Sequence, residues 1–454
     1  MYMKRYIFLL FIGLLALSCK KLIETGDPKN QLTTDKVFAD STSATAALGN
    51  LYAQFERGFE PNFTPYIGLY TDELNVTSTG TNESEFLQSR LSVTNSTNLG
   101  LWQVLYAVIY GCNDLLEKTK SSPEFPASKV TQLTSEARFL RAYAYFYLVN
   151  LYGRVPLLLS TNAKSNRQAA QNDQAEVYKQ IITDLRAAKQ GLTEVYQGSG
   201  KTRANKWAAG AMLARVYLNQ KNWAAAEEEA SQVISSGLYL PLDPVADVFK
   251  SGSKESILQF WTQQGFISSS ANLLPASDTS LPAYPITDAL YTSFEAADVR
   301  KSNWTGTSIV TTAGVPETYH YSAKYKNKEA SSGSPEYLMA LRLSEQYLIR
   351  AEARSWLGRL PEAQEDLNVV RHRAGLLNTT AENQQELLEA IAQERRVELF
   401  GEWGGRFIDL KRTGTINAVL GSYKNAWKPT AAWFPIPQSE INYNNKLIQN
   451  LGYN

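Results

Sequence analysis

Three glutamates, Glu394, Glu398 and Glu402, follow one another at intervals of four residues, so a helix would place their carboxylates on one face. Two carboxylates that flank a glycosidic bond can hydrolyse it, one of them acting as the acid. Four arginines lie close to the glutamates in the sequence: Arg395, Arg396, Arg406 and Arg412. Because such neighbours hold carboxylates in the ionised form, we favour a structural ion network over a glycoside hydrolase.

The chain has few side chains that could bind a metal ion or carry out thiol chemistry. The two histidines, His320 and His372, are not at the spacing of metal ligands, and His372 is expected at the surface. Cys112 lies in an apolar, helical stretch, which predicts a buried and inert thiol. No glycine-rich phosphate loop is present. We therefore expect no catalytic residue, no metal and no cofactor.

The charge balance argues against a nucleic-acid partner. The chain has 45 basic and 44 acidic side chains, and its formal net charge is +1. Its basic residues never run more than two in a row. Nucleic-acid binding needs clustered positive charge, so we expect no such partner.

The start of the chain has the features of a lipoprotein signal. Lys4 and Arg5 precede an apolar run over residues 6–17, which is too short to span a bilayer. The sequence ALSC then places small residues before Cys19 and resembles a lipobox, although Ala16 stands where leucine is more usual. We predict a signal peptide over 1–18, an acylated Cys19 and a polar tether over 19–34.

The mature chain reads as a helical scaffold. Apolar residues at helical spacing predict helices that begin near residue 35 and over 101–118, 132–151, 174–192 and 385–400. Residues 205–237 and 343–373 each read as two helices joined by a short turn. Ala214 and Ala226 in the first pair have the same separation as Ala351 and Ala363 in the second, which is typical of tetratricopeptide repeats.

Two polar segments interrupt this scaffold. Residues 71–99 are rich in Ser, Thr, Asn and Gly and read as a loop. Residues 238–337 form an irregular insertion of about a hundred residues with one short strand, at 256–261. We divide the chain into an N-terminal helical region over 35–237 and a C-terminal region over 238–454. The latter contains the insertion, the 343–373 repeat, and a C-terminal helix with loops over 383–454.

Four segments together resemble the SusD (RagB/SusD) family. The first is EARFLRAY at 136–143 with LYGRVP at 151–156, and the second is YLIRAEA at 347–353 with LNVVR at 367–371 and RAGL at 373–376. The third is ERRVELF at 394–400, continuing to Arg406, Asp409, Leu410 and Arg412. The fourth is FPIPQSEI at 434–441 with QNLGY at 449–453. They follow the lipobox in the family's order.

The resemblance implies a mostly α-helical, tetratricopeptide-like scaffold with a large loop-rich insertion. It implies a lipoprotein anchored in the outer membrane and facing the cell exterior. Such a protein covers a SusC-like, TonB-dependent transporter, to which it delivers a captured glycan. The family's members bind rather than cleave their ligands. Residues 20–24, KKLIE, lack the acidic cluster often associated with surface export. The sequence therefore leaves open which side of the outer membrane the protein faces.

A sugar-binding surface needs rings that stack on apolar sugar faces and polar groups that bond to hydroxyls. Loops on a rigid scaffold are where such side chains gather. The candidates in the early polar segment are Asp72, Asn82, Glu83 and Phe86, and those in the insertion are Tyr284, Trp304, Tyr319, Tyr321 and Tyr325. Five tryptophans in helices or at their ends are expected to pack internally: Trp102, Trp207, Trp223, Trp356 and Trp403.

Two other functions remain open at the level of the sequence. Some members of the family bind peptides rather than glycans. A periplasmic adaptor built from helical repeats would bind protein, but its repeats are usually contiguous, whereas here the insertion separates them.

Overall fold

The computed structural model describes residues 40–78, 80–120, 125–330 and 333–453. The predicted signal peptide, Cys19 and the tether lie outside the described residues. Within the described part of the chain, no helix has the length and apolar character needed to cross a membrane. The fold is mostly helical, as the sequence predicts, and the described residues form three sheets of two strands each.

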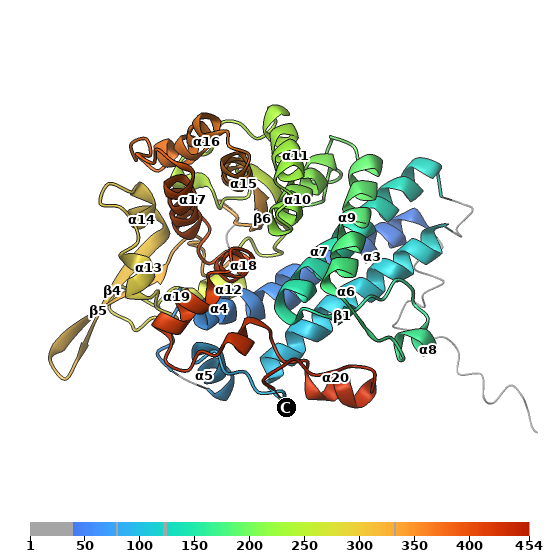
Figure 1. Cartoon of the computed structure of the whole chain (residues 1–454), viewed down its shortest axis with the longest axis horizontal. Helices are drawn as coiled ribbons and strands as arrows, with labels where there is room; N and C mark the ends of the chain where they lie inside the picture. The colour runs from blue at the N-terminus through green and yellow to red at the C-terminus, as the bar shows by residue number, and fades with distance from the viewer. Residues whose placement is uncertain (1–39, 79, 121–124, 331–332, 454) are drawn as a thin grey trace, which may run out of the picture.

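The first half of the chain is a bundle of helices, blue to green in Figure 1. Its elements are α3 (Ser41–Gln54), η2 (Phe55–Phe59), α4 (Glu60–Tyr70), α5 (Thr81–Leu87), α6 (Ser96–Lys120), α7 (Ala127–Tyr152), α8 (Ala163–Asn166) and α9 (Gln174–Gly191), with short strands β1 (Val155–Pro156) and β2 (Gln171–Asn172). The predicted helices over 101–118, 132–151 and 174–192 are confirmed as α6, α7 and α9. The segment over 71–99 is not all loop, because it contains α5 and the start of α6.

Helix α7 is the centre of this bundle. It packs against α6 on one side and α9 on another, and every side chain over 139–152 is buried. A helix that is buried all round needs apolar and aromatic residues on every face, which explains its Phe and Tyr content. The helix ends at Gly153, whose φ of 75° favours glycine.

The two predicted repeats are confirmed as helix pairs, α10 (Lys206–Asn219) with α11 (Trp223–Ser235) and α15 (Leu343–Trp356) with α16 (Leu360–Arg373). Helix α11 packs against α15, so the pairs are neighbours in space although the insertion separates them in sequence. The four alanines that mark the repeats are fully buried, and their small side chains let the helices approach closely. Helix α17 (Gln384–Glu398) continues the stack against α15 and α16.

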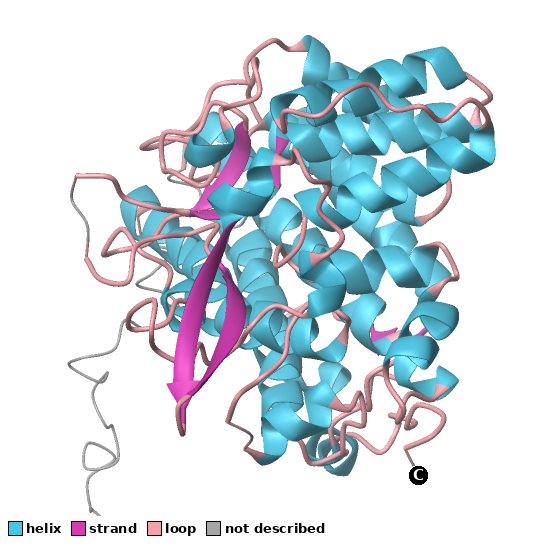
Figure 2. Ribbon diagram, turned by 90° about the vertical axis from the view of Figure 1, so that its left-hand side faces the viewer, coloured by secondary structure: helices cyan, strands magenta, loops and turns pink. Residues whose placement is uncertain are grey.

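The insertion is more ordered than the sequence predicts. The strand at 256–261 is confirmed as β3 (Ser256–Phe260), which pairs with β6 (Leu338–Arg342). The other elements were not predicted: η3 (Val245–Asp247), α12 (Ser268–Leu273), α13 (Asp288–Tyr291), α14 (Val299–Trp304) and the hairpin of β4 (Thr305–Thr312) with β5 (Val315–Ser322). Ala313 and Gly314 form its turn, both with positive φ. The hairpin projects from the helical body in Figure 1 and lies in front of the helices in Figure 2, where it is magenta.

The C-terminal segment ties the two halves together. It contains α18 (Gly405–Arg412), α19 (Ile416–Tyr423), η4 (Pro429–Ala432) and α20 (Gln438–Tyr443), so the end of the chain is not purely loop. The Phe434 amide donates to the Leu151 carbonyl at 2.9 Å, and the Asn450 side chain donates to the Tyr152 carbonyl at 2.9 Å. The chain therefore closes over the end of α7.

Candidate ligand-binding face

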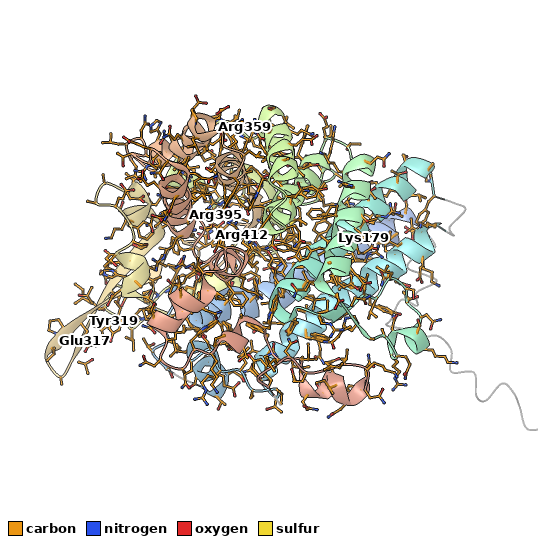
Figure 3. The ribbon with its side chains drawn as sticks, in the orientation of Figure 1. Lys179, Glu317, Tyr319, Arg359, Arg395 and Arg412 are labelled. Atoms are coloured by element: carbon orange, nitrogen blue, oxygen red, sulfur yellow. The ribbon has the colours of Figure 1, made fainter. Side chains whose placement is uncertain are left out.

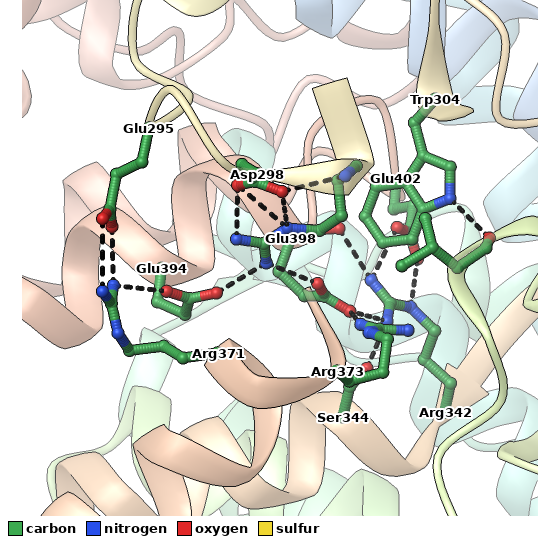
Figure 4. A network of polar contacts seen from close by, with 12 residues as sticks. Glu295, Asp298, Trp304, Arg342, Ser344, Arg371, Arg373, Glu394, Glu398 and Glu402 are labelled. Atoms are coloured by element: carbon green, nitrogen blue, oxygen red, sulfur yellow. Dashed lines mark hydrogen bonds and ion pairs between the residues drawn. The ribbon is translucent and has the colours of Figure 1, made fainter. Parts of the chain in front are cut away.

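The three evenly spaced glutamates lie inside the protein and not in an open site. Glu398 is fully buried and accepts from Arg300 Nη1 at 2.8 Å and from Arg342 and Arg373 (Figure 4). These cations hold the pKa of Glu398 well below its ordinary value despite burial. Glu402 accepts from Arg342 Nε at 2.9 Å and from Lys324 Nζ at 2.6 Å, and its pKa is also lowered.

Glu394 completes this network. It pairs with Arg300 Nη1 at 2.6 Å and with Arg371 Nη1 at 3.4 Å. Its pKa is raised, chiefly by burial, but its carboxylate is enclosed by these partners and by the neighbouring Glu398. The predicted structural ion network is therefore confirmed for the three glutamates.

The arginines named from the sequence are not the partners of these glutamates. Arg395 donates from Nε to Asp409 at 2.8 Å, and Arg412 donates to Asp409 at 2.7 Å and to Glu352. Two further arginines, Arg396 and Arg406, bind Asp72 at 2.8 and 2.9 Å. Neighbours on one helix point in different directions, so adjacency in sequence does not identify an ion pair.

The polar segment after α4 and the insertion lie side by side, although more than 200 residues separate them. The Asn75 amide donates to the Pro285 carbonyl at 2.7 Å, and the Thr77 amide donates to the Ala283 carbonyl at 3.1 Å. Leu74 and Ile286 form an isolated antiparallel bridge. The scaffold thus brings together the two segments from which ligand contacts were predicted.

Three of the predicted contacts, Asn82, Glu83 and Tyr284, are half-buried in this region, with Tyr66 of α4 beside them. The Tyr66 hydroxyl donates to Glu83 Oε1 at 2.9 Å, and Asn82 donates to the Ser96 hydroxyl at 2.7 Å. Burial and then the Glu83 charge raise the pKa of Tyr284. We name Tyr66, Asn82, Glu83 and Tyr284 the loop face; it offers rings, an amide and a carboxylate for stacking and hydrogen bonding.

The hairpin carries Tyr319 and Tyr321 on one face, because they are two residues apart on β5. Tyr321 forms a bridge with Pro285, and its ring lies over Gly306, where a side chain would collide with it. The base of the hairpin is thereby joined to the segment that carries Tyr284. Tyr319 lies further out, where its hydroxyl donates to Glu317 (Figure 3).

Four of the nine predicted contacts must be withdrawn because their side chains are buried. Phe86 is 0% exposed and packs against aromatic rings of the core. Trp304 is 1% exposed and donates to the Val245 carbonyl at 2.9 Å, and Tyr325 is 7% exposed and accepts from the Met339 amide at 2.9 Å. Asp72 is 3% exposed and is held by its two arginines.

Other side chains also differ from their predicted surroundings. Tyr66 was missed because it lies inside a helix, where its ring reads as a core residue. Trp356 was expected to pack internally; one face stacks on Trp223 with ring centroids 5.3 Å apart, but the side chain is 45% exposed. The predictions for His372, which is exposed, and for Cys112, which is buried, are confirmed. Burial raises the pKa of the Cys112 thiol, so it is not activated.

Among the described residues, no three His, Cys, Asp or Glu side chains are grouped so that they could hold a metal ion. The loop face itself consists of groups that bind neutral polar ligands: hydroxyls, an amide, one carboxylate and aromatic rings. Such groups can recognise a polar ligand by stacking and hydrogen bonding.

Comparison with known proteins gives two family matches that divide the chain between them. Residues 219–453 match the model of the SusD family, and residues 27–218 match a model described as starch-binding, associating with outer membrane. A SusD-like protein of Formosa agariphila is 23% identical over 98% of this chain and 97% of its own length. The starch-binding protein SusD of Bacteroides thetaiotaomicron is 26% identical over 75% of this chain and 76% of its own.

Solved structures agree with these matches. A laminarin-binding SusD-like protein superimposes with a TM-score of 0.78 at 26% identity, and the superposition covers 91% of this chain and 99% of the other. Most of the chain therefore shares its fold with that protein.

Proposed function

Because this chain belongs to the SusD family, we propose that it captures glycans on its loop face and passes them on without cleaving them. The observation that supports this most directly is the pairing of the segment over 74–77 with the segment over 283–286, which sets Tyr284 beside Glu83 and Tyr66. A ring next to a carboxylate and an amide suits a sugar, whose apolar face stacks while its hydroxyls form hydrogen bonds.

The names of the relatives support a glycan as the ligand. One matching protein is described as starch-binding and another as laminarin-binding, and both are therefore suitable first ligands to test. Both glycans are polymers of a neutral sugar, which suits a face that carries a single carboxylate. Starch and laminarin differ in the linkage between their sugar units, so a comparison of their binding would show which chain geometry the loop face accepts.

The cellular setting is part of the same proposal. Cys19 carries the lipid that anchors the chain in the outer membrane, with the binding region towards the cell exterior. The partner is a SusC-like, TonB-dependent transporter, which receives the glycan intact. The family model for residues 27–218, with its description of outer-membrane association, supports this location.

Affinity electrophoresis and calorimetry of the purified chain with laminarin and with soluble starch test the proposal. We expect binding to at least one of them, with no release of reducing ends. Tyr284→Ala should weaken the binding by roughly five- to tenfold, because an aromatic contact contributes about 1 kcal/mol beyond its area. Tyr319→Ala tests whether the exposed part of the hairpin contributes to binding.

Tyr443→Ala is the matched control, because Tyr443 is a well-exposed tyrosine on α20, an element that carries no loop-face residue. It should bind like the wild type, and thermal unfolding should show all three variants folded. Failure to bind any polysaccharide of a broad panel would refute the proposal. So would a folded Tyr284→Ala variant together with a Tyr319→Ala variant that both bind as tightly as the wild type.

A further inference from the structure

A groove of about 540 Å³ lies between α17 on one side and α18 and α19 on the other. Leu388 and Ala392 of α17 face Leu410 of α18 and Val419 of α19 across it. This volume falls within the range of small-molecule pockets in proteins, about 300–1,000 Å³. None of the loop-face residues lines the groove, so it is a separate feature of the molecule.

Charged groups also line this groove. Arg395 of α17 and Arg412 of α18 are labelled close together in Figure 3, and both donate to Asp409. The lining contains as many arginines as carboxylates: Arg395, Arg396, Arg406, Arg412, Glu73, Glu352, Glu389 and Asp409. A balanced lining disfavours a strongly charged ligand and suits a neutral polar one.

Three buried polar atoms of the groove residues have no hydrogen-bond partner among the described residues. They are Glu73 Oε1, Arg395 Nη1 and Arg396 Nε. Glu73 and Arg395 are 3% and 5% exposed, and an unsatisfied group at such depth carries a free-energy cost of about 1–3 kcal/mol. Folded proteins rarely leave several such atoms together without a reason.

The Glu73 carboxyl can serve either hydrogen-bonding role. Burial, and then the charge of Asp72, raise its pKa to about 7, while Arg406 and Lys324 oppose the rise. At neutral pH the carboxyl group is therefore protonated in part of the molecules and ionised in the rest. Oε1 itself is buried, so the hydroxyl groups of a ligand would meet the other guanidinium and carboxylate atoms of the lining.

The half-exposed Trp356 ring supplies an apolar wall to the same groove. Its stacking on Trp223, with an interplanar angle of 9°, fixes the plane of the ring. A fixed, accessible indole face beside groups that bind hydroxyls is an arrangement suited to a pyranose ring.

We propose that this groove is a second saccharide site, which takes a neutral mono- or disaccharide unit between α17, α18 and α19. The inference rests on the proposed function for the choice of ligand class, but not for its location. The segment over 72–77 contacts both sites, and its Glu73 lines the groove. Its Asp72 side chain binds arginines of the groove, and its Asn75 and Thr77 amides bind the insertion beside the loop face.

Calorimetry with maltose and with laminaribiose, on the purified chain, tests the groove with ligands small enough to enter it. Ala392→Trp should abolish binding in the groove, because Ala392 is exposed on α17 and a large side chain there would fill the space. Trp356→Ala should weaken binding about five- to tenfold through loss of the stacking face. Ala418→Trp is the matched control, since Ala418 is exposed on α19 but does not line the groove.

We expect the wild type, Ala418→Trp and Tyr284→Ala to retain disaccharide binding in the groove, and Ala392→Trp to lose it. Equal affinity and stoichiometry in the wild type and Ala392→Trp would overturn the second site. The second site would also be overturned if the single substitution Tyr284→Ala abolished all disaccharide binding. A wild type that binds laminarin or starch but neither disaccharide would overturn the second site and leave the proposed function standing; a wild type that binds no saccharide would overturn both.

Discussion

Replacing Glu398 with glutamine tests whether the buried glutamates are structural. The substitution keeps the size of the side chain and removes its charge. Glu398 is bound by Arg300, Arg342 and Arg373, which belong to α14, the end of β6 and the end of α16. One substitution therefore weakens the joint between the insertion and the helical repeats.

The expected loss follows from what remains after the charge is removed. Each arginine keeps another carboxylate: Asp298 for Arg300, Glu402 for Arg342 and Glu255 for Arg373. The site nevertheless loses its central negative charge at full burial. Removing one member of a buried ion pair typically lowers the free energy of unfolding by about 3–5 kcal/mol. Since the free energy of unfolding of a typical domain is only about 5–15 kcal/mol, this loss is a large fraction of its stability.

The pH dependence has a definite sign. The folded-state pKa of Glu398 is lowered, so its contribution is fully present above the ordinary value of 4.5 and is lost as the pH falls through the folded-state pKa. The difference between the wild type and Glu398→Gln should therefore be largest near neutral pH and shrink in strong acid. A catalytic acid would need a raised pKa, the opposite direction.

Urea unfolding of both proteins at neutral pH measures this difference. Glu365→Gln is the control, because Glu365 is exposed on α16, and its free energy of unfolding should stay within about 0.5 kcal/mol of the wild type. A Glu398→Gln protein as stable as this control would refute the reasoning. So would a stable variant that has lost a hydrolytic activity present in the wild type.

Two further substitutions probe the surroundings of the groove. Asp409→Asn should lower the free energy of unfolding by about 2 kcal/mol at neutral pH, because Arg395 and Arg412 lower the Asp409 pKa from 3.8 to about 2. That difference should fade between about pH 4 and 2, as followed by unfolding at several pH values; a difference that grows in acid would contradict it. Gly404→Ala should lower the free energy of unfolding by more than about 1 kcal/mol. Gly404 has a φ of 64°, and an added Cβ would lie 2.9 Å from the Phe63 ring. An unchanged melting temperature would contradict this prediction.

The sequence predicts the helical scaffold well because the relevant signals are local. Helical spacing of apolar residues and the small residues of the repeats each operate within about thirty residues. Ala214 and Ala363 could be identified as close-packing positions without knowing that α11 lies against α15. The hairpin was missed because the strands on either side of its turn, Ala313-Gly314, are exposed in their outer halves. These halves carry little apolar alternation, which is the sequence signal for a strand.

The candidate site was predicted less well because exposure depends on contacts between distant segments. Tyr284 and Trp304 are both aromatic residues of the insertion, yet Tyr284 belongs to the loop face and Trp304 is buried. What separates them is the partner: Trp304 donates to the Val245 carbonyl and lies under Arg373, whereas Tyr284 faces Glu83. No pattern within the insertion encodes that difference.

The insertion therefore has a buried part and an exposed part, and the buried part supports the exposed one. Arg300 and Lys324 extend from it into the carboxylates of α17 and of the turn that follows, and both are almost fully buried. Between these two anchors in the sequence lies the hairpin with Tyr319 and Tyr321. Because the anchors fix both ends of the hairpin to the helical scaffold, its base is held against the segment that carries Tyr284. We therefore expect the ion network to position the loop face, and weakening the network should lower glycan affinity before it unfolds the chain.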